Sequence, residues 1–480
     1  MSLHAQLSPE AEERLRAQRR NSTISSIFIS LLAIVLIGLI LAFILLPSLF
    51  FESPTIVTYN AGAPDQEDLQ KKEINNQVQR KPSAPSSSMA KVIASTTPSP
   101  TAIPVPEVDV PDPSTDFGSG DDFGDGWGSG GDGGGGGFGN IPANMRKRCS
   151  KEDRLQRLAE NGGTPECEEA VVNALRFLQK SQGKDGSWDN SNVAMTGLAL
   201  LAYLGHCETP LSEEFGETVT AAITFLVNVA TKNNGKMAND FGNKHWCYEH
   251  GIATYAISEA YTFCNQLNVN IPNLQDAVQN SVQWIINNQH KSGGWEYAYA
   301  EDAPRGGDLS IVAWQMQALK AGRATGLDFR NYESCIRKAV AYVEERQDSN
   351  GSFAYTGNSG RISLTGAGAL CLQQHKGASN SSARKGAKFL EKESKFDYKT
   401  DCNLYEHYYS TQAMINDGGN SWKKYNALFR DNLLAAQNKD GSWPVPGGKG
   451  AAGSSGSATY NTALCTLMLE VYYRFLPGTS

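Results

Sequence analysis

Charge, cysteine and basic residues are each scarce in part or all of this 480-residue sequence, and each shortage limits the possible structure or partners. Charge is absent from residues 21–51, cysteine is absent before Cys149, and basic residues are outnumbered, which leaves a net charge of −7. Nucleic acid binds basic surfaces through its phosphates, so an acidic chain excludes nucleic acid as a partner. Disulfide bonds can form only in the C-terminal part, because all nine cysteines lie there.

The uncharged stretch predicts a membrane anchor. Residues 27–51 are Leu, Ile, Phe, Val and Ala with few interruptions, and about 20 apolar residues cross a bilayer. We expect a transmembrane helix over residues 25–51. A cleaved signal peptide is the alternative, but the apolar core is long and no small-x-small cleavage site follows it. Four arginines precede the stretch, and this bias places residues 1–24 in the cytoplasm and the rest outside the inner (plasma) membrane.

A linker is expected after the anchor. Residues 80–115 are rich in Pro, Ser and Thr, and residues 116–140 in Gly and Asp. Such compositions bury too little apolar surface to fold, so residues 52–145 are predicted to be a disordered linker and residues 146–480 a folded domain. An anchor, a Pro-rich stalk and an external domain resemble the layout of TonB- or TolA-type energy transducers. That resemblance implies an envelope motor or transport complex as a partner.

The predicted domain repeats one phrase. An aromatic and an aliphatic residue are followed by Gln, then by Gly four positions later, then by an aromatic two positions after that. Full copies end at Trp188, Trp295 and Phe353, and a copy lacking the first aromatic ends at Trp443. Weaker copies begin at Phe225 and Phe389. Six units of roughly 50 residues indicate a repeat architecture.

Each unit is expected to form two helices. Residues 168–182 place apolar side chains on one face only, which is typical of an amphipathic helix. Residues 193–204 are apolar all round, so that helix has to be buried on every side. Alternating helices of these two kinds predict an all-α fold with an outer ring, an inner ring and a central cavity. In the phrase itself, Gln can satisfy backbone groups left open at a helix end, and the last aromatic can cover that turn.

The phrase resembles the QW motif of the squalene-hopene cyclase and protein prenyltransferase superfamily. This resemblance extends over residues 150–476 and implies an α6/α6 toroid. It does not imply an activity, because the same fold serves cyclases, lipid transferases, thioester domains and lanthionine cyclases.

The catalytic motifs of that superfamily are not reproduced. Where cyclases carry Asp-x-Asp-Asp-Thr, only Asp308 remains, and Gly307 stands at the position of the proton donor. The Asp-x-Cys of the prenyltransferase zinc site and the Gly-Cys-Gly-Glu-Gln of thioester domains do not occur. A cyclase of that mechanism and a prenyltransferase are therefore disfavoured.

A different pair of motifs supplies candidate site residues. Tyr-Glu-His occurs twice, at 248–250 and 405–407, each time at the start of an expected inner helix. Repeats two and five lie opposite each other in a ring of six, and inner-helix N-termini share one end of the cavity, where anions are also attracted. The candidate catalytic residues are Glu249, His250, Asp308, Glu406 and His407. They can act as acid and base or, with Cys247, hold zinc; the alternative is helix capping and mutual hydrogen bonding.

Aromatic residues surround the same predicted cavity end. The candidate ligand-binding residues are Trp246, Tyr248, Trp295, Tyr405 and Tyr460. Such a lining suits an isoprenoid lipid or another apolar chain, or the stacking of sugars, and its alternative is ordinary core packing. Among the cysteines, Cys149 and Cys167 are the expected bridge, whereas Cys371 and Cys465 lie in apolar runs and are expected to be buried thiols.

Segments 248–256, 308–315 and 469–477 together resemble a bacterial group described as prenyltransferase and squalene-oxidase repeat proteins. That description implies the fold and no activity. Three functions remain: a tethered toroid that binds an apolar or anionic ligand (isoprenoid, glycan or peptide), an enzyme that uses the Glu, His and Asp side chains, and a structural docking protein. No cofactor and no metal ligand is predicted, although the second option leaves zinc open.

Overall fold

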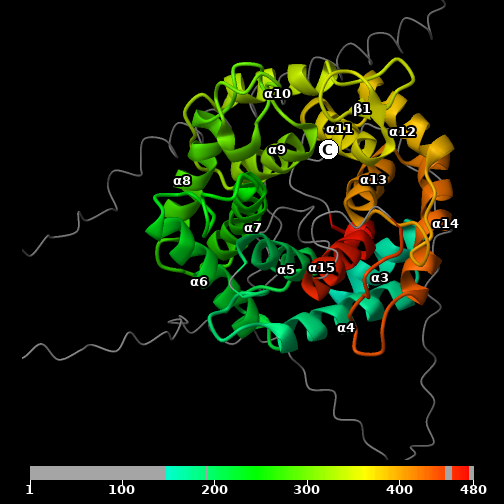
Figure 1. Cartoon of the computed structure of the whole chain (residues 1–480). Helices are drawn as coiled ribbons and strands as arrows, with labels where there is room; N and C mark the ends of the chain where they lie inside the picture. Colours follow the sequence, from blue (N-terminus) through cyan, green and yellow to red (C-terminus); the bar gives the residue numbers. More distant parts are fainter. Residues whose placement is uncertain (1–147, 191, 449–456, 475–480) are drawn as a thin grey trace, which may run out of the picture. The chain divides into compact units, whose positions relative to one another are not determined.

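The computed structural model describes residues 148–190, 192–448 and 457–474 (Figure 1). The predicted cytoplasmic segment (1–24), transmembrane helix (25–51) and linker (52–145) lie outside these residues. Among the described residues, no helix has the length and apolar character needed to cross a membrane.

Outer and inner helices alternate along the described chain. The outer helices are α4 (Pro165–Ser181), α6 (Gly216–Lys232), α8 (Leu274–Asn287), α10 (Tyr332–Glu344), α12 (Ser381–Glu393) and α14 (Gly419–Ala435). The inner helices are α5 (Val193–Gly205), α7 (Trp246–Gln266), α9 (Leu309–Ala324), α11 (Ile362–Lys376), α13 (Leu404–Asp417) and α15 (Ala458–Leu469). The remaining elements are α3 (Lys151–Glu160), η2 (Tyr297–Tyr299), η3 (Glu470–Tyr472), β1 (Phe353–Ala354) and β2 (Gly360–Arg361), and the two strands pair antiparallel.

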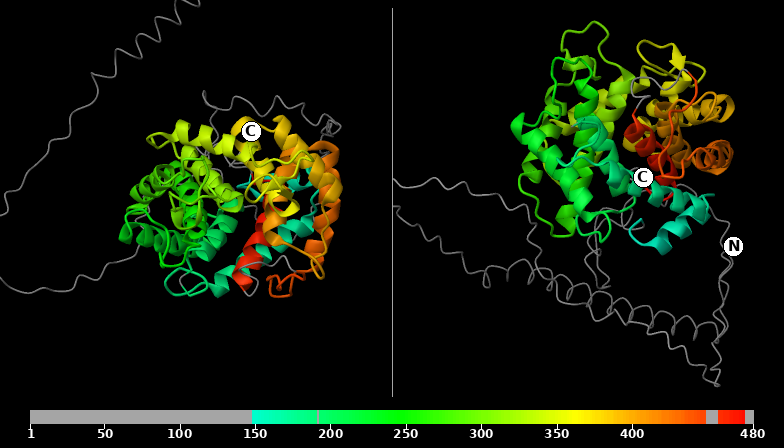
Figure 2. Two further views of the ribbon diagram at one scale, coloured as in Figure 1. Left: turned by 45° about the horizontal axis from the view of Figure 1, so that its top comes forward. Right: turned by 60° about the horizontal axis from the view of Figure 1, so that its bottom comes forward.

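The inner helices close into a ring. Each of α5, α7, α9, α11, α13 and α15 packs on the next, and α15 packs back on α5 (Figures 1 and 2). On the outside, α14 reaches α4, so the last outer helix also meets the first. The described residues therefore form an all-α toroid of six helix pairs, as the repeat predicts.

The sequence explains why the two kinds of helix lie where they do. Helix α4 begins with Pro165 and buries one apolar face that includes Val171, Leu175 and Leu178. Helix α5 is capped by Asn192, whose side chain accepts a hydrogen bond from the backbone N–H of Met195 at 3.0 Å, and all of its residues are buried. A helix without a polar face is stable only when other elements cover it on every side.

The Gln of each full phrase joins neighbouring repeats. The side-chain nitrogen of Gln182 donates to the carbonyls of Gly186 in its own turn (2.9 Å) and Thr218 in the next outer helix (3.0 Å). Gln437 does the same with Gly441 (3.0 Å) and Ala170 (2.8 Å). Ala170 belongs to α4, so the last copy of the phrase closes the ring.

The Trp and Gly of the phrase complete this joint. The indole N–H of Trp443 donates to the carbonyl of Leu433 at 2.9 Å, which satisfies an open group at the end of α14. Gly441 has a φ of +92°, and a Cβ at this position would lie 2.2 Å from the carbonyl oxygen of Asn173. Only glycine allows both this backbone conformation and this close approach.

The predicted disulfide partner of Cys149 is wrong. Cys149 is bonded to Cys207, with the two Cα atoms 4.9 Å apart, whereas Cys167 is a buried thiol in α4. The reason is that residues 148–150 lie near the end of α5: Arg154 donates hydrogen bonds to the carbonyls of both Arg148 and His206. Cys371 and Cys465 are buried thiols, as predicted.

The predicted central cavity is filled where α9 and α13 meet. Trp314 stacks on Tyr408 with ring centroids 5.2 Å apart, and it also contacts Tyr409 edge-on. All three side chains are buried. Side chains of the inner helices therefore occupy the middle of the ring at this level, and the accessible residues of the interior have to lie nearer its ends.

Candidate functional site

Tyrosines gather where three inner helices begin. The hydroxyl of Tyr248, in the first turn of α7, lies 2.6 Å from Oγ of Ser310 in α9. The hydroxyl of Tyr405, in the first turn of α13, donates to the carbonyl of Ser310 at 3.2 Å. Because these residues come from different repeats, the ring closure brings them together. We call this group, with Tyr297, Tyr355 and Asp308, the tyrosine mouth.

Three of the four tyrosine hydroxyls in the tyrosine mouth form one chain, which does not include that of Tyr405. Tyr355 is hydrogen-bonded to Tyr297 at 2.7 Å, and Tyr297 to Tyr248 at 3.3 Å. From Tyr248 the chain continues through Ser310, whose Oγ donates to Oδ1 of Asp308 at 2.6 Å. All four tyrosines are half-buried, so the chain runs from partly exposed phenols to a buried carboxyl group.

Asp308 is the N-cap of α9. Its Oδ1 accepts from the backbone N–H of Ser310 at 2.9 Å, which is the usual role of aspartate at this position. Its Oδ2 is buried without a hydrogen-bond partner among the described residues, and the nearest cation, Arg305 Nη1, lies 3.9 Å away. Burial raises the pKa of Asp308, although its hydrogen bonds and Arg305 oppose that shift.

An ion pair between Arg305 and Glu296 lies beside Tyr297. Arg305 forms an ion pair with the buried carboxylate of Glu296 and lies 5.0 Å from the centre of the Tyr297 ring. Burial raises the pKa of the Tyr297 hydroxyl above its ordinary value. The phenol therefore stays neutral near pH 7 and can both donate and accept hydrogen bonds.

The two predicted histidines do not face the tyrosine mouth. Nδ1 of His250 accepts from the backbone N–H of Met237 at 2.9 Å, in the segment between α6 and α7. Nδ1 of His407 is hydrogen-bonded to the hydroxyl of Tyr425 in the outer helix α14 at 2.7 Å. Burial lowers the pKa of each histidine to about 3. Both side chains are neutral: His250 joins α7 to the segment before it, and His407 joins α13 to the outer helix α14.

The two predicted glutamates also lie apart. Glu249 is half-buried beside Asn239 and Asp240, and Glu406 is buried near Asp401. Burial, followed by the nearby aspartate, raises the pKa of each glutamate to about 7. They lie in the first turns of two different helices, α7 and α13, and each is close to an aspartate of the segment before its own helix.

Of the predicted ligand-binding residues, two belong to the tyrosine mouth and a third lies near it. Tyr248 and Tyr405 are members, and the half-buried Tyr460 in α15 is close enough to influence the pKa of Tyr405. Trp295 is fully buried and donates to the carbonyl of Ile285, as the phrase requires. Trp246 packs against Tyr299 with ring centroids 4.8 Å apart, on the same side as His250.

Tyr355 was not among the predicted residues, and the sequence holds a signal that could have found it. It stands two positions after Phe353, the last residue of the third phrase, as Tyr297 stands two positions after Trp295. The same offset in neighbouring repeats brings the two phenols together. Ser310 gives no such signal, because its role depends on its contacts with α7 and α13.

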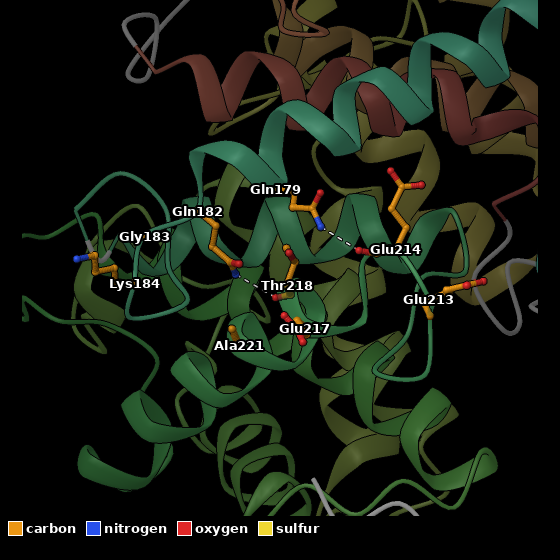
Figure 3. A pocket seen from close by; sticks show the side chains of 10 residues that line it. Gln179, Gln182, Gly183, Lys184, Glu213, Glu214, Glu217, Thr218 and Ala221 are labelled. Carbon is orange, nitrogen blue, oxygen red and sulfur yellow. Dashed lines mark hydrogen bonds between the residues drawn. The ribbon is translucent and has the colours of Figure 1, made fainter. Parts of the chain in front are cut away.

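The described residues offer no metal site, and one pocket of the structure lies away from the tyrosine mouth. Within residues 148–190, 192–448 and 457–474, no group of three or more His, Cys, Asp and Glu side chains has the geometry of a metal site. A separate pocket of about 620 Å³ lies between the end of α4 and the start of α6 (Figure 3). Gln179, Glu213, Glu214 and Glu217 line it together with the joint at Gln182.

Comparison with known proteins gives structural likenesses only. No protein-family model matches the chain, and no curated protein matches it. The structure is similar to an α-1,6-mannanase from Salegentibacter sp. HEL1_6, with 12% identity over 65% of this chain and 100% of that chain and a TM-score of 0.47. It is also similar to a type II terpene cyclase from Scytonema in complex with geranylgeranyl dihydroxybenzoate, with 13% identity over 68% and 99% and a TM-score of 0.44. The toroid assignment therefore rests on the closed ring of helix contacts.

Proposed function

We propose that the chain is a membrane-anchored, extracytoplasmic toroid that binds a neutral, hydroxyl-rich ligand, a glycan segment, at the tyrosine mouth. The observation that carries this proposal is the chain of three tyrosine hydroxyls that continues through Ser310 to Oδ1 of Asp308, whose Oδ2 is buried without a hydrogen-bond partner among the described residues. The anchor rests on the composition of residues 25–51, and an envelope complex as partner rests on the tethered layout.

The chemistry of the tyrosine mouth favours a glycan over the other ligand classes. A partly exposed phenol offers an apolar face on which a sugar ring can stack and a polar tip that can bond to its hydroxyls. An isoprenoid would strip water from these hydroxyls without replacing the lost hydrogen bonds. An anion would meet the acceptor oxygen of Asp308, and the nearby Arg305 is already paired with Glu296.

Acid catalysis at Asp308 is the second candidate. Its raised pKa and unpartnered Oδ2 suit a proton donor. Hydrolysis of a glycan, however, uses two carboxyl groups on either side of the scissile bond. The other carboxylate beside the tyrosine mouth, Glu296, is buried and occupied by Arg305 and the backbone N–H of Tyr297. This arrangement favours binding over hydrolysis.

The proposal is tested by calorimetry on the full-length chain in detergent, titrated with neutral oligosaccharides of defined linkage. The double variant Tyr297→Phe/Tyr355→Phe removes two hydroxyls and keeps the rings. We expect about thirtyfold weaker binding, since each of the two lost hydrogen bonds contributes roughly 1 kcal/mol. The matched control is Tyr261→Phe, because the Tyr261 hydroxyl contacts Gln275 at the outer surface.

Two further results decide between the candidates. Asp308→Asn keeps the shape of the N-cap, so a binding protein should retain measurable affinity and an enzyme should lose turnover of the same oligosaccharides. Affinity that is equal in the double variant and the wild type would exclude the tyrosine mouth as the binding site.

A further inference from the structure

Arg148, the first described residue, is completely buried toward the other end of the inner helices. Its Nη2 donates to Oε1 of Glu259 in α7 at 2.5 Å, and its guanidinium lies 5.1 Å from the centre of the Phe263 ring. Arginine is seldom fully buried unless it is paired. The side chain therefore occupies a specific pocket in the ring.

A second arginine and a second glutamate line this pocket. Arg474 donates to Oε2 of Glu259 at 3.2 Å and to the hydroxyl of Tyr255 at 3.0 Å. The carboxylate of Glu470 packs so closely on Gly205 that a Cβ there would lie 1.9 Å from its Oε2. We call Tyr255, Glu259, Phe263, Glu470 and Arg474 the arginine pocket.

Arg148 is held in the arginine pocket by few contacts of its own. Its Nε and Nη1 have no hydrogen-bond partner among the described residues, although both are buried. Moving a charge out of water costs several kcal/mol, and one ion pair offsets that cost only in part. A further restraint is therefore needed, and the adjacent residue supplies one, since Cys149 is bonded to Cys207 beside the end of α5.

We propose that the Cys149–Cys207 disulfide is a redox latch that keeps Arg148 in the arginine pocket. Breaking the bond frees residues 148–150, Arg148 leaves for water, and this end of the ring opens around Glu259 and Arg474. The latch is independent of the ligand proposed for the tyrosine mouth.

The chemistry needs an external dithiol as the reductant. Its thiolate attacks the sulfur of the half-buried Cys149, and Cys207 leaves as a thiolate that takes up a proton. The second thiol of the reductant then attacks the mixed disulfide, which releases Cys149 as a thiol and leaves the reductant as a cyclic disulfide. Two electrons and two protons pass from the reductant to the protein.

Hydrogen exchange on the full-length chain tests the latch, with and without dithiothreitol. Thiol alkylation and mass measurement confirm that the bond is broken. After reduction we expect amides of residues 258–266, which include the Arg148 contacts Glu259 and Phe263, to exchange about tenfold faster, because local opening controls their rate. Residues 362–376 of α11 should be unchanged. The variant Cys149→Ser/Cys207→Ser should show the fast rate with or without the reductant.

The variant Arg148→Ala keeps the disulfide. It distinguishes a disulfide that acts by holding Arg148 in place from one that stabilises the whole domain. If Arg148 closes the arginine pocket, this variant should also exchange about tenfold faster at residues 258–266 while its helix content stays that of the wild type. Two results would overturn the proposal: unchanged exchange at residues 258–266 after the bond is shown to be broken, or faster exchange over the whole domain, which would make the disulfide a global staple.

Discussion

The two ends of the inner ring solve the burial of polar groups in opposite ways. Helix α7 contributes to both, through Tyr248 near its start and Glu259 toward its end. The tyrosine mouth joins half-buried, neutral phenols into a hydrogen-bonded chain, whereas in the arginine pocket Arg148 and Arg474 pair with the fully buried Glu259. Neutral hydroxyls tolerate partial exposure, so that end stays partly open to solvent, whereas buried charges require complete enclosure, so the other end is closed.

The helix dipoles agree with this division. The N-terminal ends of helices carry partial positive charge and the C-terminal ends partial negative charge. Asp308 lies at the start of α9, and Arg474 follows the last inner helix, α15. Asp308 and Arg474 therefore each lie at the end that stabilises their charge, whereas Glu470, at the C-terminal end of α15, does not.

Removing the shared acceptor of the arginine pocket should have the largest effect. Glu259→Ala leaves Arg148 and Arg474 buried without their common partner, and we expect the free energy of unfolding to fall by about 3–5 kcal/mol. Urea unfolding followed by circular dichroism measures this change. Glu333→Ala, which breaks an exposed pair with Arg323, is the control and should change stability by less than about 1 kcal/mol. Equal losses of stability in Glu259→Ala and Glu333→Ala would show that the buried ion pairs contribute no more than an exposed one.

At the start of α13, Glu406 should make stability depend on pH. Its pKa is raised from 4.5 to about 7, so the folded state binds the proton more tightly than the unfolded state. The resulting stabilisation is complete below pH 4.5 and is lost as the pH rises through 7. Glu406→Gln should remove this loss, a difference of about 3 kcal/mol between pH 4.5 and pH 8, given 1.36 kcal/mol for each pKa unit. Unfolding curves across that range measure it, with the exposed Glu393→Gln as control. Parallel profiles for wild type and Glu406→Gln would contradict the shift.

Both ends of the inner ring depend on the closure of the ring by the last copy of the phrase, which contains Gly441. Gly441→Ala combines a φ of +92° with a contact of 2.2 Å to Asn173, and we expect a loss of about 2–3 kcal/mol in the free energy of unfolding. Gly326→Ala shares the positive φ but has no atom within 4 Å of its new Cβ, and it should lose about 1 kcal/mol. A thermal or urea melt of both variants isolates the energetic cost of the contact. Equal losses would show that the turn after α14 does not pack closely on Asn173 of α4.

The smallest change is expected at the tyrosine mouth. Tyr405→Phe removes one hydrogen bond to the carbonyl of Ser310, 3.2 Å long and partly exposed, so stability should fall by less than about 1 kcal/mol. Chemical denaturation measures this value. A loss as large as that of Glu259→Ala would mean that the tyrosine mouth contributes as much to the stability of the fold as the arginine pocket.

Much of the fold could be predicted because the phrase is local. The amphipathic stretch expected at 168–182 corresponds to α4 at Pro165–Ser181, and the apolar stretch at 193–204 corresponds to α5 at Val193–Gly205. The Gln, Gly and Trp of the phrase act on backbone groups a few residues away and on the next repeat, so their spacing alone implies their contacts.

The candidate site could be predicted only in part, because the direction in which a helix faces was unknown. Tyr248 and His250 are two positions apart, which is about 200° around a helix, so only one of them can face the tyrosine mouth. The structure turns Tyr248 toward Ser310 and His250 toward Met237 in the segment before α7. The Tyr-Glu-His triplet shows where a helix begins, and it does not show which member points inward.

By itself the sequence determined the repeat, the alternation of amphipathic and fully apolar helices and the joints between neighbouring units, since these depend on residues close together in the chain. Only the tertiary structure decided the partner of Cys149, the meeting of Tyr248, Tyr405 and Asp308, and the arginine pocket. Those contacts join residues that are far apart in the chain, and they exist only once the ring has closed.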